Sequence, residues 1–258
     1  MLDQHNYNEF MSKIFKLTGI DLSSYKEKQM KRRLDSLIEK KSLNTYDEYI
    51  NLIKTSPTDL EEFLDRMTIN VSEFFRNGER WEVLDQKILP LITAGTDKIK
   101  VWSAACSTGQ EPYSLAMLFE SQGLKYEILA TDLDEKVLNK ARQGKFNIKE
   151  KEGIPEKHHK YLNINGETFT VDPKLKRYIK FQKHNLLENS YPTDFDLILC
   201  RNVMIYFKES TKKEVYKRFN QSLKDNGILF VGSTEQIFFA SNLSFKSLDT
   251  FFYKKVNS

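Results

Sequence analysis

Hydrophobic residues in the first 75 positions recur at the spacing of amphipathic helices. Phe10, Ile14 and Leu17 lie three or four residues apart, and Gly19 can end the helix that they predict. A second apolar face runs from Met30 to Ile38. We therefore expect this part of the chain to be helical.

Capping signals separate these helices from one another. Ser23 or Ser24 can cap the second helix, and the segment 45–48 has the form of a capping box before a third. Ser56-Pro57 is a typical start for a fourth. The pattern predicts a small bundle of about four helices.

From about residue 80 the pattern changes to apolar runs that alternate with helical stretches. Strands are predicted at 99–103, 126–131, 178–182, 195–200, 228–231 and 251–254, and helices at 81–91, 111–121, 135–142 and 212–223. The helix at 81–91 is expected to stop near Pro90. Strands that alternate with helices predict an α/β fold with a mostly parallel, doubly wound sheet.

Residues 146–177 do not follow this alternation. They carry turn-forming residues around short apolar runs, with a tight-turn signal at Asn165-Gly166. We expect a small antiparallel insertion in the α/β domain.

Composition limits the class of protein. The chain has 258 residues, of which 40% are hydrophobic and 29% charged, typical of a globular domain with a small addition. No apolar run approaches the roughly 18–20 residues of a membrane span, and the polar N-terminus lacks a signal-peptide pattern, so a cytoplasmic protein without membrane insertion is expected. Cys106 and Cys200 are expected to be buried thiols in a reducing compartment, and no ligand spacing for a metal is present.

The net charge of +4 is too small to indicate nucleic-acid binding by itself. Basic residues nevertheless gather between Lys26 and Lys41. This basic cluster is either a solvated helix face or a dock for an acidic partner.

The loop after the first predicted strand is made of small residues, from Ser103 to Gly109. Ligands of open α/β sheets bind at the carboxyl ends of strands, and small side chains let a ligand reach the backbone. Gly109 is the only glycine of this loop, so the dinucleotide fingerprint is absent, and the loop also lacks a phosphate-loop lysine. Glu111 would repel a phosphate but suits a cation or an amine.

The second strand ends at Asp132, where an acid can bind the two hydroxyls of a ribose. Asp134, in contrast, can simply cap the next helix. An adenosine with a positively charged, amine-containing tail would satisfy both Glu111 and Asp132. S-adenosylmethionine is such a molecule.

Four stretches of the sequence carry a family resemblance: RMTINVSEFFRN, VWSAACSTGQEPYSLAM, ATDLD and LILCRNVMIYF. Together they resemble the chemotaxis receptor methyltransferases, the CheR family, over nearly the whole chain. The resemblance implies a helical N-terminal domain for receptor docking at 1–75. It also implies a Rossmann-like class I S-adenosylmethionine-dependent methyltransferase domain at 76–258, with a β insertion at about 146–180.

The resemblance also implies the activity. Members of this family transfer a methyl group from S-adenosylmethionine to glutamate side chains in the cytoplasmic helical region of membrane chemoreceptors, which gives methyl esters and S-adenosylhomocysteine and serves adaptation in bacterial chemotaxis. No nucleic acid is involved, and a monomer is expected. A glutamate with an ordinary pKa of about 4.3 is already ionised at pH 7, so the reaction needs no general base.

The site residues follow from the matching motifs. The cofactor site is expected to include Asn70, Ser72, Arg76, Glu111, Asp132, Asn185, Leu186, Arg201 and Asn202. Arg76 and Tyr206 are expected to act on the reacting groups, Arg76 as a carboxylate clamp and Tyr206 facing the methyl group. Ser72 stands where the family usually has Thr, and a short insertion around 163–169 puts in doubt the peptide tether that some members bind there.

Three other functions would also be compatible with an α/β sheet of this kind. Against a methyltransferase for nucleic acids or small molecules, the chain lacks an N-P-P-Y-type tetrapeptide and has RNVM at 201–204 instead. A sensor that holds S-adenosylmethionine without turnover would not need Arg76 and Tyr206. A nicotinamide-dependent reductase is excluded by the missing glycines.

Overall fold

The computed structural model describes residues 4–68, 72–187 and 190–256. The chain divides into two compact units, one formed by Met1–Ile69 with Tyr206–Lys212 and the other by Asn70–Ile205 with Lys213–Ser258. We call them the helical unit and the catalytic unit, and each is described on its own.

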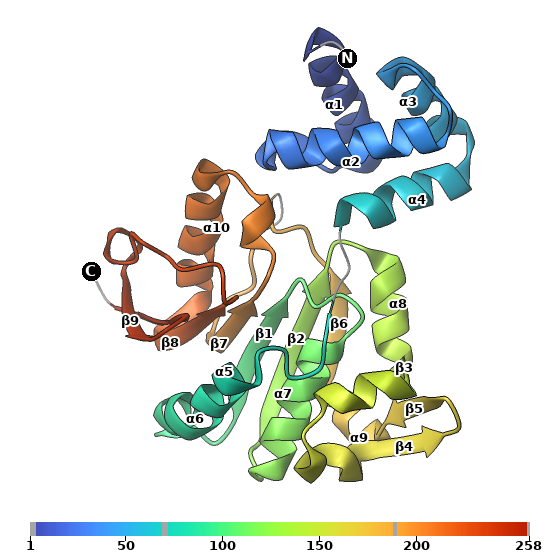
Figure 1. Cartoon of the computed structure of the whole chain (residues 1–258). Helices are drawn as coiled ribbons and strands as arrows, with labels where there is room; N and C mark the ends of the chain where they lie inside the picture. Colours follow the sequence, from blue (N-terminus) through green and yellow to red (C-terminus); the bar gives the residue numbers. More distant parts are fainter. Residues whose placement is uncertain (1–3, 69–71, 188–189, 257–258) are drawn as a thin grey trace. The chain divides into compact units, whose positions relative to one another are not determined.

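The helical unit contains the predicted bundle (Figure 1). Its helices are α1 (Gln4–Thr18), α2 (Glu27–Lys40), α3 (Tyr46–Thr55) and α4 (Pro57–Thr68), with a short 3₁₀ turn at Leu22–Ser24. Aromatic rings form much of its core: Phe10 lies 5.2 Å from Tyr46 between ring centroids, and Tyr49 lies 6.3 Å from Phe63. The predicted all-helical region is confirmed.

The predictions of helix caps are confirmed at Thr45 and Gly19 and are wrong at Ser23 and Ser24. Thr45 and Glu48 form the expected capping box, and Gly19 adopts the left-handed conformation (φ 73°) that ends α1. The prediction that Ser23 or Ser24 caps α2 is wrong, because α2 begins at Glu27 and its preceding residue makes no side-chain cap. Both serine hydroxyls instead donate to the carboxylate of Asp21, a stronger acceptor that caps the 3₁₀ turn.

The catalytic unit is built on a seven-stranded sheet in the order β6-β2-β1-β7-β8-β10-β9. The strands are β1 (Ile99–Ala104), β2 (Tyr126–Asp132), β6 (Ile179–Lys183), β7 (Phe195–Cys200), β8 (Leu223–Val231), β9 (Phe245–Asp249) and β10 (Phe252–Lys255). The five strands from β6 to β8 are parallel, and β10 pairs antiparallel with β8 and β9. The predicted mostly parallel, doubly wound sheet is confirmed.

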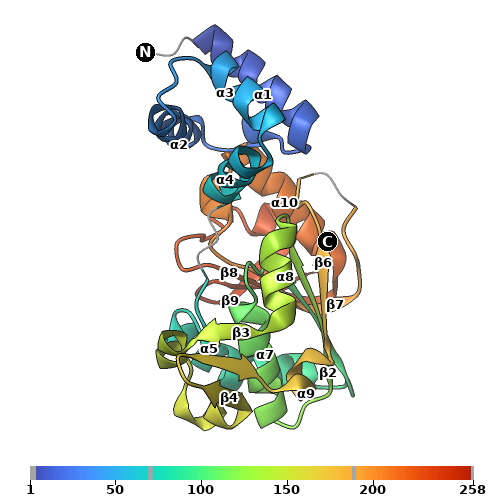
Figure 2. The ribbon, with the colours of Figure 1, turned by 90° about the vertical axis from the view of Figure 1, so that its right-hand side faces the viewer.

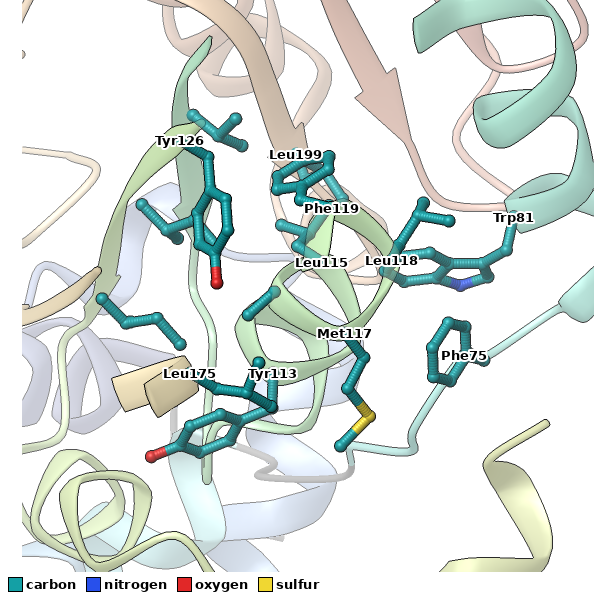
Figure 3. Packing of buried hydrophobic residues seen from close by; sticks show 14 of the residues in the cluster. Phe75, Trp81, Tyr113, Leu115, Met117, Leu118, Phe119, Tyr126, Leu175 and Leu199 are labelled. Atoms are coloured by element: carbon teal, nitrogen blue, oxygen red, sulfur yellow. The ribbon is translucent and has the colours of Figure 1, made fainter. Parts of the chain in front are cut away.

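Three longer helices belong to this alternation: α7 (Gln110–Ser121), α8 (Glu135–Gln143) and α10 (Glu209–Ser222). Helix α7 is buried almost all round, because every residue from Pro112 to Phe119 is buried. Figure 3 shows Leu115, Phe119 and Tyr126 packed together in this core. The burial fixes α7, and therefore the loop that precedes it.

The helix predicted at 81–91 does not stop near Pro90. Helix α5 (Gly78–Val83) continues through a π-helical turn at Leu84–Ile88 into α6 (Leu89–Thr93). Proline has no backbone N–H, but at the start of a new helical segment this group is not required. The wider turn therefore carries the helix past the proline.

The predicted antiparallel insertion is present as a second sheet in the order β3-β5-β4 (Figure 2). It comprises β3 (Lys145–Asn147), β4 (Leu162–Asn165), β5 (Thr168–Val171), 3₁₀ segments at Ile148–Gly153 and Glu156–Tyr161, and the short α9 (Pro173–Lys176). Gly166 makes the predicted hairpin turn with φ 58°. Phe146 packs its ring 4.8 Å from that of Phe74 and 5.9 Å from that of Tyr113, so the insertion shares the core of α7.

Strand β9 was not predicted. It lies at the edge of the sheet, and its side chains are mostly exposed and polar (FKSLD), so it lacks an apolar run. Its backbone pairing with β10 gives the strand its form.

Candidate active site

The strand order creates a switch point beside β1. The chain runs from β1 to β2 on one side of it, and later returns to β7 on the other side. The loop at the carboxyl end of β1 turns sharply: Ala105, Ser107 and Gly109 have φ of 63°, 50° and 98°. A Cβ on Gly109 would lie 2.9 Å from the Cβ of Ala141 on α8, so a larger residue does not fit. The string of small residues thus serves a tight turn at the place where ligands bind in such sheets.

Asp132 lies at the end of β2 and supports this loop. Its carboxylate accepts hydrogen bonds from the backbone N–H of Ser107 (2.8 Å) and of Asp134 (3.1 Å). Burial raises the pKa of Asp132 to about 6, although these backbone donors work in the opposite direction. Each carboxylate oxygen has two acceptor positions, so Asp132 retains capacity for further donors. Asp134 is the N-cap of α8, as its alternative role predicted.

Glu111 lies in the first turn of α7 and is part of a buried polar network. Its carboxylate accepts a hydrogen bond from the Ser103 hydroxyl (2.7 Å), and its other oxygen lies 3.6 Å from a guanidinium nitrogen of Arg201. Burial raises the pKa of Glu111, and the charge of Arg201 opposes that shift. The acid is therefore held in place by one hydroxyl and one cation.

Arg201 follows β7 and braces the segment before α5. Its Nη2 donates to the backbone carbonyl of Arg76 (2.7 Å) and to the side chain of Asn77 (3.1 Å). The guanidinium carbon lies 4.6 Å from the ring centroid of Phe230, and burial lowers the pKa of Arg201. Within the described chain, the Nε of Arg201 and the hydroxyl of Ser107 are both buried without a hydrogen-bond partner. Buried polar atoms are normally paired, so both mark a place where a polar ligand would be bound.

These groups surround a hollow of about 40 Å³, which has room for little more than a water molecule. Its lining consists of Ser72, Glu73, Arg76, Ala105, Cys106, Ser107, Glu111, Arg201 and Asn202. It brings together five of the predicted site residues from three separate segments of the chain. A nucleoside-sized ligand would place only one end in this hollow.

Comparison with known proteins identifies the family. The model for the CheR methyltransferase all-alpha domain matches residues 5–68, and the model for the CheR methyltransferase SAM binding domain matches residues 70–253. The chain belongs to the CheR methyltransferase family. Its cofactor is accordingly S-adenosylmethionine.

Relatives agree over most of their length. The chain is 42% identical over 256 residues, 98% of both proteins, to the chemotaxis protein methyltransferase of Listeria monocytogenes. It is 32% identical over 247 residues to that of Escherichia coli, covering 91% of this chain and 85% of the relative. Among solved structures, the CMeT domain of the citrinin polyketide synthase is 16% identical and covers 71% of this chain and 41% of that one, with a TM-score of 0.42. No described helix of this CheR chain is long and apolar enough to cross a membrane.

The residues of the hollow fit the methionyl end of S-adenosylmethionine. That end carries an ammonium, which would donate hydrogen bonds to the Glu111 carboxylate. It also carries a carboxylate, to which the unpaired Nε–H of Arg201 would donate. Asp132 is joined to the same loop through Ser107 and would take the ribose hydroxyls. The chemistry of the donors and acceptors therefore suits this cofactor.

The remaining predicted residues lie outside the lining of the hollow. Asn185 accepts a hydrogen bond from the backbone N–H of Leu187 (3.0 Å), and Leu186 is buried. Both follow His184, which comes directly after β6 and whose backbone N–H donates to the carbonyl of Asp132 (2.9 Å). They therefore lie at the carboxyl edge, next to the end of β2. Their contact with the adenine stays a prediction.

Two predicted residues cannot be placed against the hollow. Asn70 lies outside the described residues. Tyr206 falls in the helical unit, where its carbonyl accepts a hydrogen bond from the backbone N–H of Lys26 (2.8 Å) and its ring lies 5.1 Å from the guanidinium carbon of Arg33. Its role toward the methyl group stays a prediction.

Sequence reasoning missed Glu235, which organises the loop after β7. Its buried carboxylate accepts hydrogen bonds from the backbone N–H of Gly232 (2.8 Å), Asn202 (2.8 Å) and Ile205 (3.2 Å). Asn202 is thereby held in a left-handed conformation with φ 62°. The available signal was an acid shortly after the strand predicted at 228–231, which is the argument that had singled out Asp132.

The two cysteines are not candidates for catalysis. Cys106 and Cys200 are buried free thiols, and burial raises the pKa of both well above its usual range. No group of three or more potential metal ligands occurs among the residues that the structure describes. Phe74, Phe75 and Trp102 are buried, as expected for packing residues.

A larger hollow of about 730 Å³ lies on another part of the catalytic unit. Lys98, Glu127, Lys180 and Tyr191 are among the residues that line it, and it shares no residue with the hollow at the carboxyl edge. Lys98 and Glu127 form an ion pair there (2.6 Å). Size alone favours this surface, whereas the buried polar network and the unpartnered buried atoms of Ser107 and Arg201 favour the carboxyl edge.

Proposed function

We propose that this CheR methyltransferase transfers the methyl group of S-adenosylmethionine to glutamate side chains in the cytoplasmic helical region of membrane chemoreceptors, for adaptation in bacterial chemotaxis. The products are glutamate methyl esters and S-adenosylhomocysteine. The observation that carries the proposal is the hollow, where Arg76 stands beside the buried pair of Glu111 and Arg201. The described lining contains no histidine or lysine, and its acid Glu111 is engaged by Ser103 and Arg201.

This composition suits a carboxylate as the methyl acceptor. A glutamate is ionised at pH 7 and is already a nucleophile, so no proton has to be removed. An amine or hydroxyl acceptor would have to lose a proton, and a base would then be needed. The curated relatives in Listeria and Escherichia are named chemotaxis protein methyltransferases, which supports the same substrate class.

The residues of the chain would mainly position the reacting groups. S-adenosylmethionine supplies a methyl group on a sulfonium, which is activated for direct displacement. Arg76 would hold both oxygens of the glutamate, because its planar guanidinium matches a carboxylate. Positioning of this kind can lower a barrier by roughly 7–11 kcal/mol.

The other assignments follow from the edge of the sheet. Glu111 and Arg201 would hold the methionyl end, Asp132 the ribose, and Asn185 with Leu186 the adenine. Asn70, Ser72 and Asn202 would complete the cofactor site. Tyr206 would face the methyl group.

The helical unit is proposed to dock on the receptor. The basic cluster on α2 would face the acidic helices that carry the methylated glutamates. The protein is proposed to act in the cytoplasm as a monomer.

The test is transfer of radiolabelled methyl from S-adenosylmethionine to membranes that contain chemoreceptors, followed by alkali. Carboxyl methyl esters hydrolyse in alkali and release volatile labelled methanol, which is the expected result. Label that stays on protein after alkali would mean N- or C-methylation and would refute the glutamate assignment. Membranes without chemoreceptors serve as the control and should acquire no label.

A further inference from the structure

Two adjacent phenylalanines project from the loop between β8 and β9, which is coloured orange to red in Figure 1. Phe238 is 83% exposed and Phe239 is 62% exposed, which makes them the most exposed large hydrophobic residues of the described chain. A single exposed apolar residue is ordinary, but a phenylalanine side chain buries about 150–250 Å² when it packs. A contiguous aromatic pair of this kind indicates a surface that another molecule covers.

Hydrogen bonds on both sides of the pair fix the backbone of the loop. Ile237 beside them is buried, and its backbone N–H donates to the Tyr253 hydroxyl (2.9 Å). On the other side, the carbonyl of Phe239 accepts a hydrogen bond from the backbone N–H of Asn242 (3.1 Å). The pair is therefore presented by local structure and does not result from a slack loop.

The same loop is tied to the candidate active site through Glu235. This carboxylate accepts hydrogen bonds from its own loop at Gly232 and from Asn202, which lines the hollow. Only two residues separate Glu235 from Phe238. The aromatic pair is thus fixed to the carboxyl edge, where the macromolecular substrate has to arrive.

Positive charge adjoins the rings. The Nζ of Lys213 on α10 lies 5.6 Å from the centroid of the Phe239 ring. Lys217 is exposed one helical turn further along the same face. Within the described residues neither lysine has an ion-pair partner, so both charges remain available to a partner.

We propose that Phe238, Phe239 and Lys213 form a docking surface for the substrate helix of the chemoreceptor. The occupant is an amphipathic helix that offers apolar residues to the two rings and acidic residues to the lysines. This inference rests on the proposed function and adds to it a contact on the catalytic unit itself. Docking there would hold the target helix against the carboxyl edge during transfer.

The double variant Phe238→Ser/Phe239→Ser tests the surface by steady-state methylation of receptor-containing membranes. We expect KM for receptor to rise about tenfold, since a buried aromatic contact at an interface contributes more than about 1 kcal/mol. The kcat, the Kd for S-adenosylmethionine and the Tm should stay unchanged. Leu91→Ser is the matched control, because Leu91 is 59% exposed on α6 and does not belong to this surface.

A second variant, Lys213→Glu, protects the test against a folding defect in the first. It should raise KM about threefold at low salt and lose that effect at high salt. Normal KM in both variants, with an active parent protein, would overturn the docking surface alone. Absence of alkali-labile label from the parent protein would overturn the proposed function and the surface with it.

Self-association is the remaining outcome to be measured. Sedimentation of the parent protein and of the double variant should give the same monomeric mass. A dimer that dissociates in the double variant would mean that the rings bind a second copy of the chain, and would overturn the receptor assignment.

Discussion

In the helical unit the charged side chains pair on the surface, whereas the catalytic unit buries several of them. Lys41 forms ion pairs with Asp59 and Glu62, and all three side chains remain partly exposed. The buried charged residues of the described chain, which are Asp132, Asp196, Arg201 and Glu235, all belong to the catalytic unit. The side chain of Glu111 is 13% exposed and comes close to the same state.

The difference indicates what each set of charges is for. Exposed ion pairs contribute only about 0–1 kcal/mol each and leave a surface able to attract an oppositely charged partner. A buried charge costs several kcal/mol unless it is well paired, so it persists where its pairing or its chemistry is needed. The catalytic unit uses Glu235 to hold loops, and we propose that it uses Asp132 and Glu111 to bind a ligand.

The largest effect is expected where a buried acid has only structural partners. Glu235→Ala leaves backbone N–H groups of Gly232, Asn202 and Ile205 without an acceptor, so the free energy of unfolding should fall by about 3 kcal/mol. Urea denaturation followed by circular dichroism measures this. Glu152→Ala is the control, because Glu152 is exposed, and it should change little. Equal stability of the two variants would show that the buried Glu235 contributes no more to folding than the exposed Glu152.

Arg76→Ala should separate chemistry from folding. Transfer to receptor should fall about a hundredfold, because the carboxylate is no longer aligned. Stability should be kept, since the Arg76 carbonyl still accepts hydrogen bonds from Trp81 (3.1 Å) and Arg201 (2.7 Å). Label transfer and Tm are the two readouts, with the exposed Arg177→Ala as control. Retention of most of the activity would remove the clamp assignment.

The pKa of Asp132 predicts opposite pH trends for stability and for cofactor binding. It is raised from 3.8 to about 6, so its contribution to stability is present below pH 3.8 and is lost as the pH rises through 6. We propose that the ionised form accepts hydrogen bonds from the ribose hydroxyls, so affinity for S-adenosylmethionine should fall about tenfold from pH 7 to pH 5.

Titration calorimetry at several pH values tests this prediction. Asp132→Asn should bind more weakly at pH 7 and should lose most of the pH dependence. A variant with the full pH dependence of the parent protein would show that another group is titrating and that the ribose lies elsewhere.

The smallest effect is expected from the exposed charges of the helical unit. Lys31 pairs with Glu27, and Arg33 donates to the carbonyl of Met67, so neither is suited to a clean test of docking. Lys28 and Arg32 are exposed on α2, and their reversal to Glu should raise KM for receptor about threefold at low salt only.

Lys16→Glu is the matched control for this reversal, because Lys16 is exposed on α1 outside the basic cluster. Methylation kinetics at two salt concentrations decide the question. An unchanged KM at low salt would return the cluster to an ordinary solvated face.

The sequence by itself determined the order of the elements and predicted the place of the site. Apolar periodicity separated the helical region from the α/β region, and the end of each parallel strand indicated where Asp132 would stand. Local capping chemistry was predictable at Thr45, where both partners lie within four residues. It failed at Ser23 because α2 begins only at Glu27, and both serines belong to the 3₁₀ turn that Asp21 caps.

The tertiary structure alone decided which distant groups meet. Glu235 reaches the backbone of Asn202, and Arg201 reaches the carbonyl of Arg76 across 125 positions of sequence. Bonds from a side chain to a remote backbone group leave no periodic or spacing signal, because any residue can supply the N–H or the carbonyl. The exposure of Phe238 and Phe239 could not be predicted from the sequence either. An apolar run predicts burial, and only the fold shows which of its side chains stay exposed.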